Sequence, residues 1–142
     1  MGMILHDCIR FAKENPICYL ATSVNDQPHV RALGFWFADE TGFYFQTGSF
    51  KEFPKELKKN PWTEACFYHH EGMIGTMLRI SGEVEFIDDR KLKERVINER
   101  PFLKTFGLTI DSPELIIFRI PHGKAHFWTM ATNLKPKEFI EF

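Results

Sequence analysis

Three apolar runs of strand length follow one another through four-residue turns near the start of the chain, and this spacing constrains the fold more than any other feature. The runs are ICYLATSV (17–24), HVRALGFWFA (29–38) and FYFQT (43–47), and the turns between them are NDQP (25–28) and DETG (39–42). Asn, Asp, Gly and Pro favour tight turns, whereas β-branched and aromatic residues favour strands. Because turns this short join strands that pair with each other, the pattern predicts an antiparallel meander.

The rest of the chain continues this pattern, with short helices inserted between strands. Three helices are expected, over 3–14, from about Pro54 to Asn60, and from Asp88 or Asp89 through Arg100. Four further strands are expected at 63–69, 78–86, 114–120 and 124–131, and 101–113 reads as a long connection. Seven mostly antiparallel strands with three short helices favour a mainly β fold, a small barrel with the helices packed outside, in a single domain over 1–142.

Composition and charge exclude several classes of function. Hydrophobic residues make up 44% of the 142, enough for a packed core, and a net charge of −1 leaves no basic field for nucleic acid. The longest apolar runs have strand length, so no membrane span is expected. Three cysteines at no metal-like spacing indicate reduced thiols in a cytoplasmic protein, and the histidines at 69, 70, 122 and 126 lack a ligand spacing on strands, so no metal site is expected.

Two cations stand out because of where they lie along the chain. Arg31 sits mid-strand among apolar neighbours, where a buried charge is costly unless it is paired or bound to an anion. Lys51 lies between the third strand and a helix, and the two cations approach each other if the second and third strands pair as a hairpin. Each has an ordinary alternative: an edge-strand arginine that reaches water, and a solvated turn lysine. Together with the hydroxyls of Thr47 and Ser49 and the amides near Gly48, they predict a phosphate pocket beside aromatic surface suited to a flat cofactor.

With these features the sequence resembles a known family, the pyridoxamine 5′-phosphate oxidase-like, FMN-binding split-barrel superfamily in its short form. The segments that carry the resemblance are PICYLATSVNDQPHVRALGFWF, GFYFQTGSFKEFPKELKKNP and MLRISGEVEFIDD, in the same order and with similar spacing over residues 1–100. The resemblance implies a split β-barrel of six to seven mostly antiparallel strands. It also implies a homodimer, with FMN in a groove between the subunits.

The same resemblance implies which residues contact the flavin. The family's strand arginine maps onto Arg31 and binds the phosphate, and the family's turn lysine maps onto Lys51 as a second phosphate contact. Trp128 is the residue expected to cover the flavin ring from the partner subunit, the alternative being a core or interface tryptophan. The full set of expected cofactor-binding residues is Arg31, Ala32, Leu33, Phe45, Gln46, Thr47, Ser49, Lys51 and Trp128.

Two departures from the family pattern bear on the activity. The glutamine that often precedes the ISG-like segment corresponds to Met77, and the C-terminal sequence NLKPKEFIEF lacks the arginine that binds substrate in pyridoxamine phosphate oxidases. The sequence therefore predicts an FMN-dependent oxidoreductase with another small-molecule substrate and NAD(P)H as a candidate electron donor, and it identifies no catalytic acid or base. The alternatives are a flavin-binding or flavin-storing module without turnover, and a member that binds deazaflavin or haem. Apolar residues on both faces of the first two strands independently favour a dimer.

Overall fold

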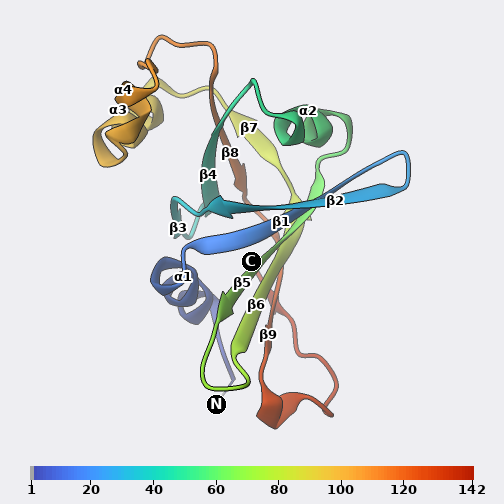
Figure 1. Ribbon diagram of the computed structural model, residues 1–142. Helices are drawn as coiled ribbons and strands as arrows, with labels where there is room; N and C mark the ends of the chain where they lie inside the picture. Colours follow the sequence, from blue (N-terminus) through green and yellow to red (C-terminus); the bar gives the residue numbers. More distant parts are fainter. Residues whose placement is uncertain (1) are drawn as a thin grey trace.

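The computed structural model describes residues 2–142 and contains two antiparallel sheets that do not close into one barrel (Figure 1). The larger sheet has the strand order β10-β9-β6-β5-β1-β2, and the smaller has the order β3-β4-β8-β7. The mainly β, split architecture expected from the resemblance is therefore confirmed. The strands are β1 Ile17–Val24, β2 Gln27–Gly34, β3 Phe37–Asp39, β4 Gly42–Gly48, β5 Trp62–His69, β6 Thr76–Glu83, β7 Glu85–Ile87, β8 Leu115–Ile120, β9 Gly123–Trp128 and β10 Ile140–Glu141.

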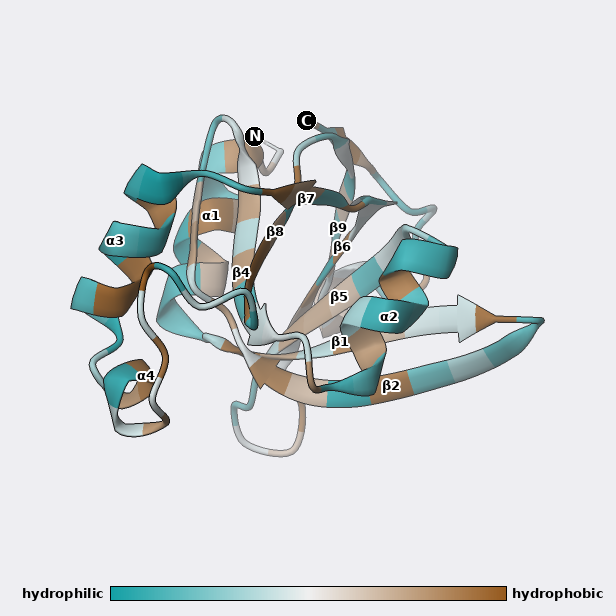
Figure 2. Cartoon of the chain, turned by 90° about the horizontal axis from the view of Figure 1, so that it is seen from above, coloured by the Kyte–Doolittle hydropathy of each residue, from teal (hydrophilic) through white to brown (hydrophobic). Residues whose placement is uncertain are grey.

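Helices cover the sheets at three places. The helices are α1 Leu5–Glu14, α2 Glu52–Lys59, α3 Arg90–Glu99 and α4 Phe102–Thr105, with a 3₁₀ turn at Met130–Thr132. Figure 2 shows α3 and α4 on one side of the molecule and α2 on the other, beside the long β1–β2 hairpin. Of the two residues expected to cap the third helix, Asp88 and Asp89, the N-cap is Asp89, whose carboxylate accepts a hydrogen bond from the Leu92 amide at 3.0 Å. No helix in residues 2–142 is long and apolar enough to cross a membrane.

The main core lies between the two sheets and is rich in phenylalanine. Phe45 on β4 stacks on Phe118 of β8, with ring centroids 5.1 Å apart. Phe35 bridges the sheets, because its ring is 5.5 Å from that of Phe45 and 5.3 Å from that of Phe67 on β5. Edge-to-face and offset contacts of this kind stabilise a core beyond the area they bury. The core therefore ties the strand that carries Arg31 to the small sheet.

Two of the expected strands are each broken in two, and this corrects the predicted meander. Residues 29–38 form the end of β2 and the start of β3, and residues 78–86 form most of β6 and the start of β7. At each break one buried apolar residue leaves the ladder, and its amide bonds to a proline carbonyl: Phe35 to Pro16 at 2.6 Å, and Val84 to Pro61 at 2.8 Å. The chain changes sheets at these two points. Consequently β2 pairs with β1 alone, and only β3 carries the expected second strand into the small sheet, where it pairs with β4.

Smaller differences between the expected and observed elements concern the first turn, the connection 101–113 and the C-terminal residues. The first turn narrows to Asn25 and Asp26, which have φ values of 51° and 65°, so Gln27 and Pro28 belong to β2. Positive φ at both central residues suits a tight hairpin, and Asn and Asp tolerate it better than other side chains. The connection 101–113 contains α4, and a two-residue strand near the C-terminus pairs with β9. Within residues 2–142, ten strands thus replace the seven expected.

Candidate functional site

Arg31 lies on the inward side of β2, and its guanidinium is held by three hydrogen bonds. Nη1 donates to the Leu20 carbonyl at 3.2 Å and to the Thr22 hydroxyl at 2.8 Å. Nη2 donates to the Glu56 carboxylate at 2.7 Å. The carbon at the centre of the guanidinium stands 5.3 Å from the centroid of the Phe53 ring, within cation–π range. The side chain is 23% exposed, so Arg31 is neither fully exposed nor fully buried.

One edge of this guanidinium is free. An arginine carries five N–H donors, and the bonds to Leu20, Thr22 and Glu56 use three of them. The two that remain are the Nε–H and the second Nη2–H, which form one edge of the planar fork. Within residues 2–142 the only buried, unpartnered side-chain atoms are the Thr47 hydroxyl and Nε of Arg119, so the unpartnered Nε of Arg31 is not fully buried. A free two-donor edge is the arrangement that binds two oxygens of a phosphate or carboxylate.

Glu56 and Thr22 complete a closed group with Arg31. The Thr22 hydroxyl donates to the same Glu56 oxygen, Oε1, at 2.7 Å. This hydrogen bond lowers the pKa of Glu56, and the hydrogen bond and charge of Arg31 lower it further against the opposing effect of burial. Sequence reasoning missed both residues. A polar threonine on the inward side of an otherwise apolar strand, and a glutamate three residues after Phe53 on the helix, were the available signals.

The N-terminus of α2 supplies a second set of donors. Lys51 is its N-cap residue and has an exposed side chain, and no side chain caps the helix. The amides of Glu52 and Phe53 begin the helix, whereas Pro54 has no N–H to offer. Uncapped amides at a helix N-terminus attract anions. Because Phe53 and Glu56 of the same helix contact Arg31, α2 connects the two cations that the sequence singled out, although β2 and β4 do not pair.

Thr47 is a further polar group near this helix. It follows Phe45 by two residues on β4, so both side chains lie on the core side of the small sheet, where Phe118 also contacts Phe53 of α2. The residue is 4% exposed, and its hydroxyl has no hydrogen-bond partner within residues 2–142. A buried hydroxyl without a partner is costly, about 1–3 kcal/mol, and usually points to an absent ligand or water.

Other residues expected at the site lie elsewhere or offer only backbone. The Phe45 ring is fully buried in the core. Gln46 faces the opposite side of β4, where its Oε1 accepts a hydrogen bond from Arg100 at 2.9 Å. Ser49 is half-buried and its amide donates to the Glu114 carbonyl at 2.9 Å. The remaining pair, Ala32 and Leu33, follow Arg31 on β2, with Ala32 exposed and Leu33 packed on the core.

Trp128 is far from Arg31 within one chain. It lies on β9 opposite Met77 of β6, and its indole N–H donates to the Asn133 side chain at 2.9 Å. Strands β6, β5 and β1 separate β9 from β2. Four strand spacings correspond to about 19 Å. Trp128 therefore does not lie beside Arg31 of its own chain.

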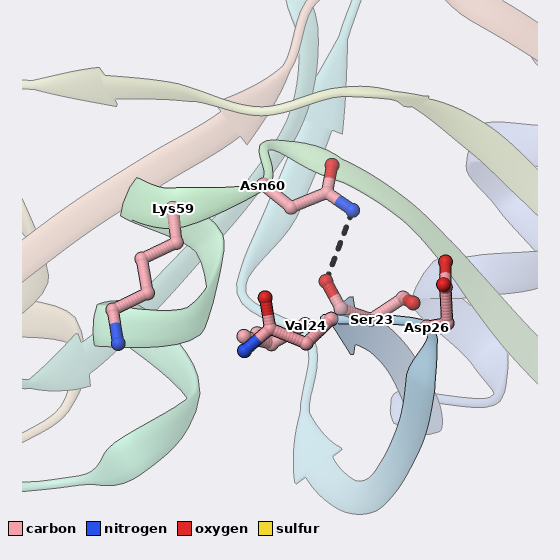
Figure 3. Close-up of a pocket in the computed structure, with 6 residues that line it drawn as sticks. Ser23, Val24, Asp26, Lys59 and Asn60 are labelled. Atoms are coloured by element: carbon pink, nitrogen blue, oxygen red, sulfur yellow. Dashed lines mark hydrogen bonds between the residues drawn. The ribbon is translucent and has the colours of Figure 1, made fainter.

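Two surface hollows lie outside this group of residues. One has a volume of about 350 Å³ and lies where the β1–β2 turn meets the C-terminal end of α2. There the Asn60 side chain donates to the Ser23 carbonyl at 2.9 Å (Figure 3). A larger one, of about 730 Å³, lies between Trp62, the Pro121–Gly123 turn and Phe142. Neither includes Arg31 or Lys51. Within residues 2–142 no three His, Cys, Asp or Glu side chains are grouped as a metal site.

Comparisons with known proteins agree with this fold. Residues 5–129 match the sequence family described as pyridoxamine 5′-phosphate oxidase. A NimC/NimA family protein from Clostridium acetobutylicum has a similar structure, with a TM-score of 0.81, 26% identity, and coverage of 97% of this chain and 93% of that one. No curated protein sequence matches the chain.

Two more distant structures share the fold and differ in their ligands. A haem-binding protein from Mycobacterium smegmatis has a TM-score of 0.76 and 10% identity, covering 99% of this chain and 59% of that one. An FAD-binding protein from Mesorhizobium loti has a TM-score of 0.68 and 18% identity, covering 88% and 94%. At these identities the likeness concerns the fold alone.

Proposed function

The chain belongs to the pyridoxamine 5′-phosphate oxidase family, and from this premise we propose that it binds one FMN per subunit and acts as a flavin-dependent oxidoreductase on a small molecule. The observation that carries the proposal is the free edge of Arg31, a charge fixed by protein contacts with two donors left open. Such an edge binds a phosphate monoester through two parallel hydrogen bonds. The FAD-binding relative adds support at the level of the fold.

The residues present fit a flavin phosphate. Arg31 would contribute its free edge and Lys51 its ammonium group, while the amides at the start of α2 would add uncharged donors. A phosphate oxygen would also give the buried Thr47 hydroxyl the partner it lacks. Two cations beside a helix N-terminus neutralise a dianion, which favours FMN over riboflavin.

We propose that the site is completed by a second subunit in a homodimer. The outer side of the large sheet exposes large apolar residues, among them Ile17 and Tyr19 on β1, Val30 on β2 and Trp62 on β5. Apolar surface of this extent on adjoining strands usually marks an interface. Trp128 lies on the same sheet but about four strand spacings from Arg31, and we propose that it covers the flavin held by the other subunit.

FMN, when bound, supplies hydride and single-electron transfer. The chain would hold the FMN phosphate through Arg31 and Lys51. We assign no side chain as an acid or base, and we propose NAD(P)H as the electron donor. Oxidation of pyridoxamine 5′-phosphate is expected to be slow, because Met77 offers no polar hydrogen at the position that corresponds to the family's glutamine.

The test is an absorbance spectrum of the purified protein, followed by titration with FMN and then addition of NADH or NADPH. We expect flavin bands at one FMN per subunit, and bleaching of these bands by one of the two donors. Flavin bands without bleaching would favour a binding or storage module. A haem Soret band would favour the ligand of the mycobacterial relative, and a deazaflavin spectrum would favour that cofactor. A heat-denatured supernatant without flavin, together with no FMN binding in titration, contradicts the proposal.

The dimer has its own measurement. Light scattering at micromolar concentration with FMN present should give twice the mass of the 16.7 kDa chain. Trp62→Glu on the outer side of the large sheet should shift the protein toward monomer and lower its FMN affinity, because the partner then no longer covers the ring. A monomer that binds FMN as tightly as the parent protein would show that no second subunit is needed.

A further inference from the structure

We propose that Glu56 is a positioning residue of the phosphate site: with Thr22 it fixes the guanidinium of Arg31 so that the Nε–Nη2 edge is the one presented to the ligand. This inference rests on the proposed flavin function. It assigns a role to a carboxylate that lies beside the proposed phosphate site. The Glu56 side chain is 18% exposed, so it is a half-buried partner of Arg31 and not a fully solvated surface contact.

The geometry of the three residues supports this role. The Glu56 and Thr22 oxygens that bind Nη2 and Nη1 are themselves joined by a hydrogen bond of 2.7 Å. They therefore form one rigid acceptor pair along the end of the fork. The Leu20 carbonyl holds the remaining Nη1 proton. With these contacts made, rotation of the guanidinium would break at least one hydrogen bond, so the free edge keeps a single direction before the ligand arrives.

Glu56 also ties that direction to the rest of the site. It lies on α2, five residues after Lys51, whereas Arg31 lies on β2 of the large sheet. The contacts of Glu56 and Phe53 with Arg31 fix how the helix that carries the second cation sits against the strand that carries the first. A change in the reach of the carboxylate should thus disturb the angle between the two cations as well as Arg31 itself.

A competing role for Glu56 is a carboxylate that occupies the phosphate position until the ligand displaces it. The placement of the bonds argues against this role. Glu56 and Thr22 occupy the end of the fork, while the side edge is free, so a phosphate need not displace the carboxylate to bind. The Glu56 carboxylate also accepts a hydrogen bond from the Thr22 hydroxyl, and displacement of the carboxylate would break this bond without forming another.

The experiment separates the reach of the side chain from its charge. Glu56→Gln keeps the reach and an acceptor oxygen but removes the charge, whereas Glu56→Asp keeps the charge and shortens the reach by one methylene. The measured quantity is the ratio of riboflavin Kd to FMN Kd, from quenching of flavin fluorescence, which reports on the phosphate contacts alone. We expect the ratio in Glu56→Gln to stay within about threefold of the parent, and the ratio in Glu56→Asp to fall about tenfold, the loss of one charge-assisted hydrogen bond.

The matched control is a second glutamate–arginine pair, Glu85 with Arg119 at 3.1 Å, on the small sheet. Glu85→Gln and Glu85→Asp should leave the ratio unchanged. A rise of the ratio in both Glu56 variants would mean that Glu56 competes with the phosphate, and an unchanged ratio in Glu56→Asp would mean that it positions nothing; either result overturns the inference. An equal loss of FMN and riboflavin affinity would assign Glu56 a folding role only.

The proposed function fails separately, and visibly in the parent protein. If the parent binds neither flavin, the proposed function and this inference fail together. If the parent binds riboflavin and FMN equally, flavin binding stands but the phosphate site at Arg31, and with it the role of Glu56, is wrong. Both Glu56 substitutions are conservative, and circular dichroism melting curves verify that the variants are folded at the temperature of the titration.

Discussion

Two mid-strand arginines, Arg31 on β2 and Arg119 on β8, have closely similar surroundings. Their side chains are 23% and 25% exposed. Each donates to a hydroxyl, that of Thr22 or of Tyr44, and each lies over an aromatic ring. Each also donates to a glutamate carboxylate.

The difference lies in the remaining edge of the guanidinium. Nε of Arg119 is buried and has no hydrogen-bond partner within residues 2–142, so it offers no donor at the surface, whereas Nε of Arg31 is not fully buried and belongs to a side chain that contacts Phe53 at the start of α2. The carboxylates differ in the opposite sense: Glu56 is 18% exposed and Glu85 is 52% exposed. A mid-strand arginine is thus no evidence for a ligand by itself. An arginine that protein contacts hold in one direction while two of its donors stay unused is such evidence, because these donors are available to a ligand.

Replacing each arginine by alanine should give the largest difference between the two sites. Arg31→Ala should weaken FMN binding by about a hundredfold or more, since two charge-assisted hydrogen bonds contribute about 1.5–3 kcal/mol each. Arg119→Ala should leave FMN affinity within about threefold of the parent and instead lower stability. Flavin fluorescence titrations with FMN and riboflavin measure the first effect, and urea unfolding measures the second. If Arg31→Ala weakens both flavins equally, the two arginines are alike and both are structural.

Lys51→Ala should have the next largest effect. We expect FMN to bind about ten to a hundred times more weakly, because a lysine offers a point charge and loses up to about 2 kcal/mol of side-chain entropy on being ordered. Lys55→Ala, on the exposed side of α2 and paired with Glu52, is the matched control. The same titration decides the matter. A larger loss for Lys51→Ala than for Arg31→Ala would reverse the assigned order of the two cations.

A pair of threonines sharpens the comparison at a smaller scale. Thr47→Val removes a buried hydroxyl that has no partner, so stability without ligand should rise by up to about 1 kcal/mol while FMN affinity falls a few fold. Thr41→Val, near Arg119, removes a hydroxyl bound to Tyr44 at 2.6 Å and should lower stability by about 1 kcal/mol with no effect on FMN. Urea unfolding of the two ligand-free variants measures this. A loss of stability in Thr47→Val would mean that its hydroxyl has a partner.

The smallest expected effect concerns acid. The pKa of Glu56 lies below its ordinary value of 4.5, first because of the hydrogen bond from Thr22 and then because of Arg31. A lowered pKa in the folded state contributes stability that is fully present above pH 4.5 and is lost as the pH falls through the folded-state pKa. Glu56→Gln should therefore make the free energy of unfolding less dependent on pH below this value. Urea unfolding at neutral and acidic pH compares the slopes, and identical slopes would contradict the assignment.

The sequence was sufficient for the element types, and insufficient where one buried contact decides the path of the chain. Alternating apolar residues predicted the strands, and the family motifs predicted the split sheets. The breaks at Phe35 and Val84 were missed because both residues continue the apolar pattern of a strand, and only the bond of each amide to a proline carbonyl distant in the sequence takes it out of the ladder.

The residues of the candidate site also divide into those that the sequence predicted and those that it did not. Arg31 and Lys51 were predictable from the sequence, because a charge in an apolar strand and a lysine in a hydroxyl-rich turn are local features. Glu56 was not, because a glutamate on a short, strongly charged helix is ordinary until the fold places it against β2. The position of Trp128 relative to Arg31 depends on strand order, which periodicity alone does not provide.

The crossing at Phe35 has a consequence for which length changes the chain can accept. Only Phe35 and Trp36 separate β2, which carries Arg31, from β3, which opens the small sheet. An inserted residue there would either pull the Phe35 ring from between the sheets or turn β3 over, because neighbouring side chains on a strand point to opposite faces. An insertion between Asn25 and Asp26 would only lengthen an exposed hairpin tip. Natural variation in loop length should therefore collect at the hairpin tip and be absent from the crossing, even though both are short links between strands.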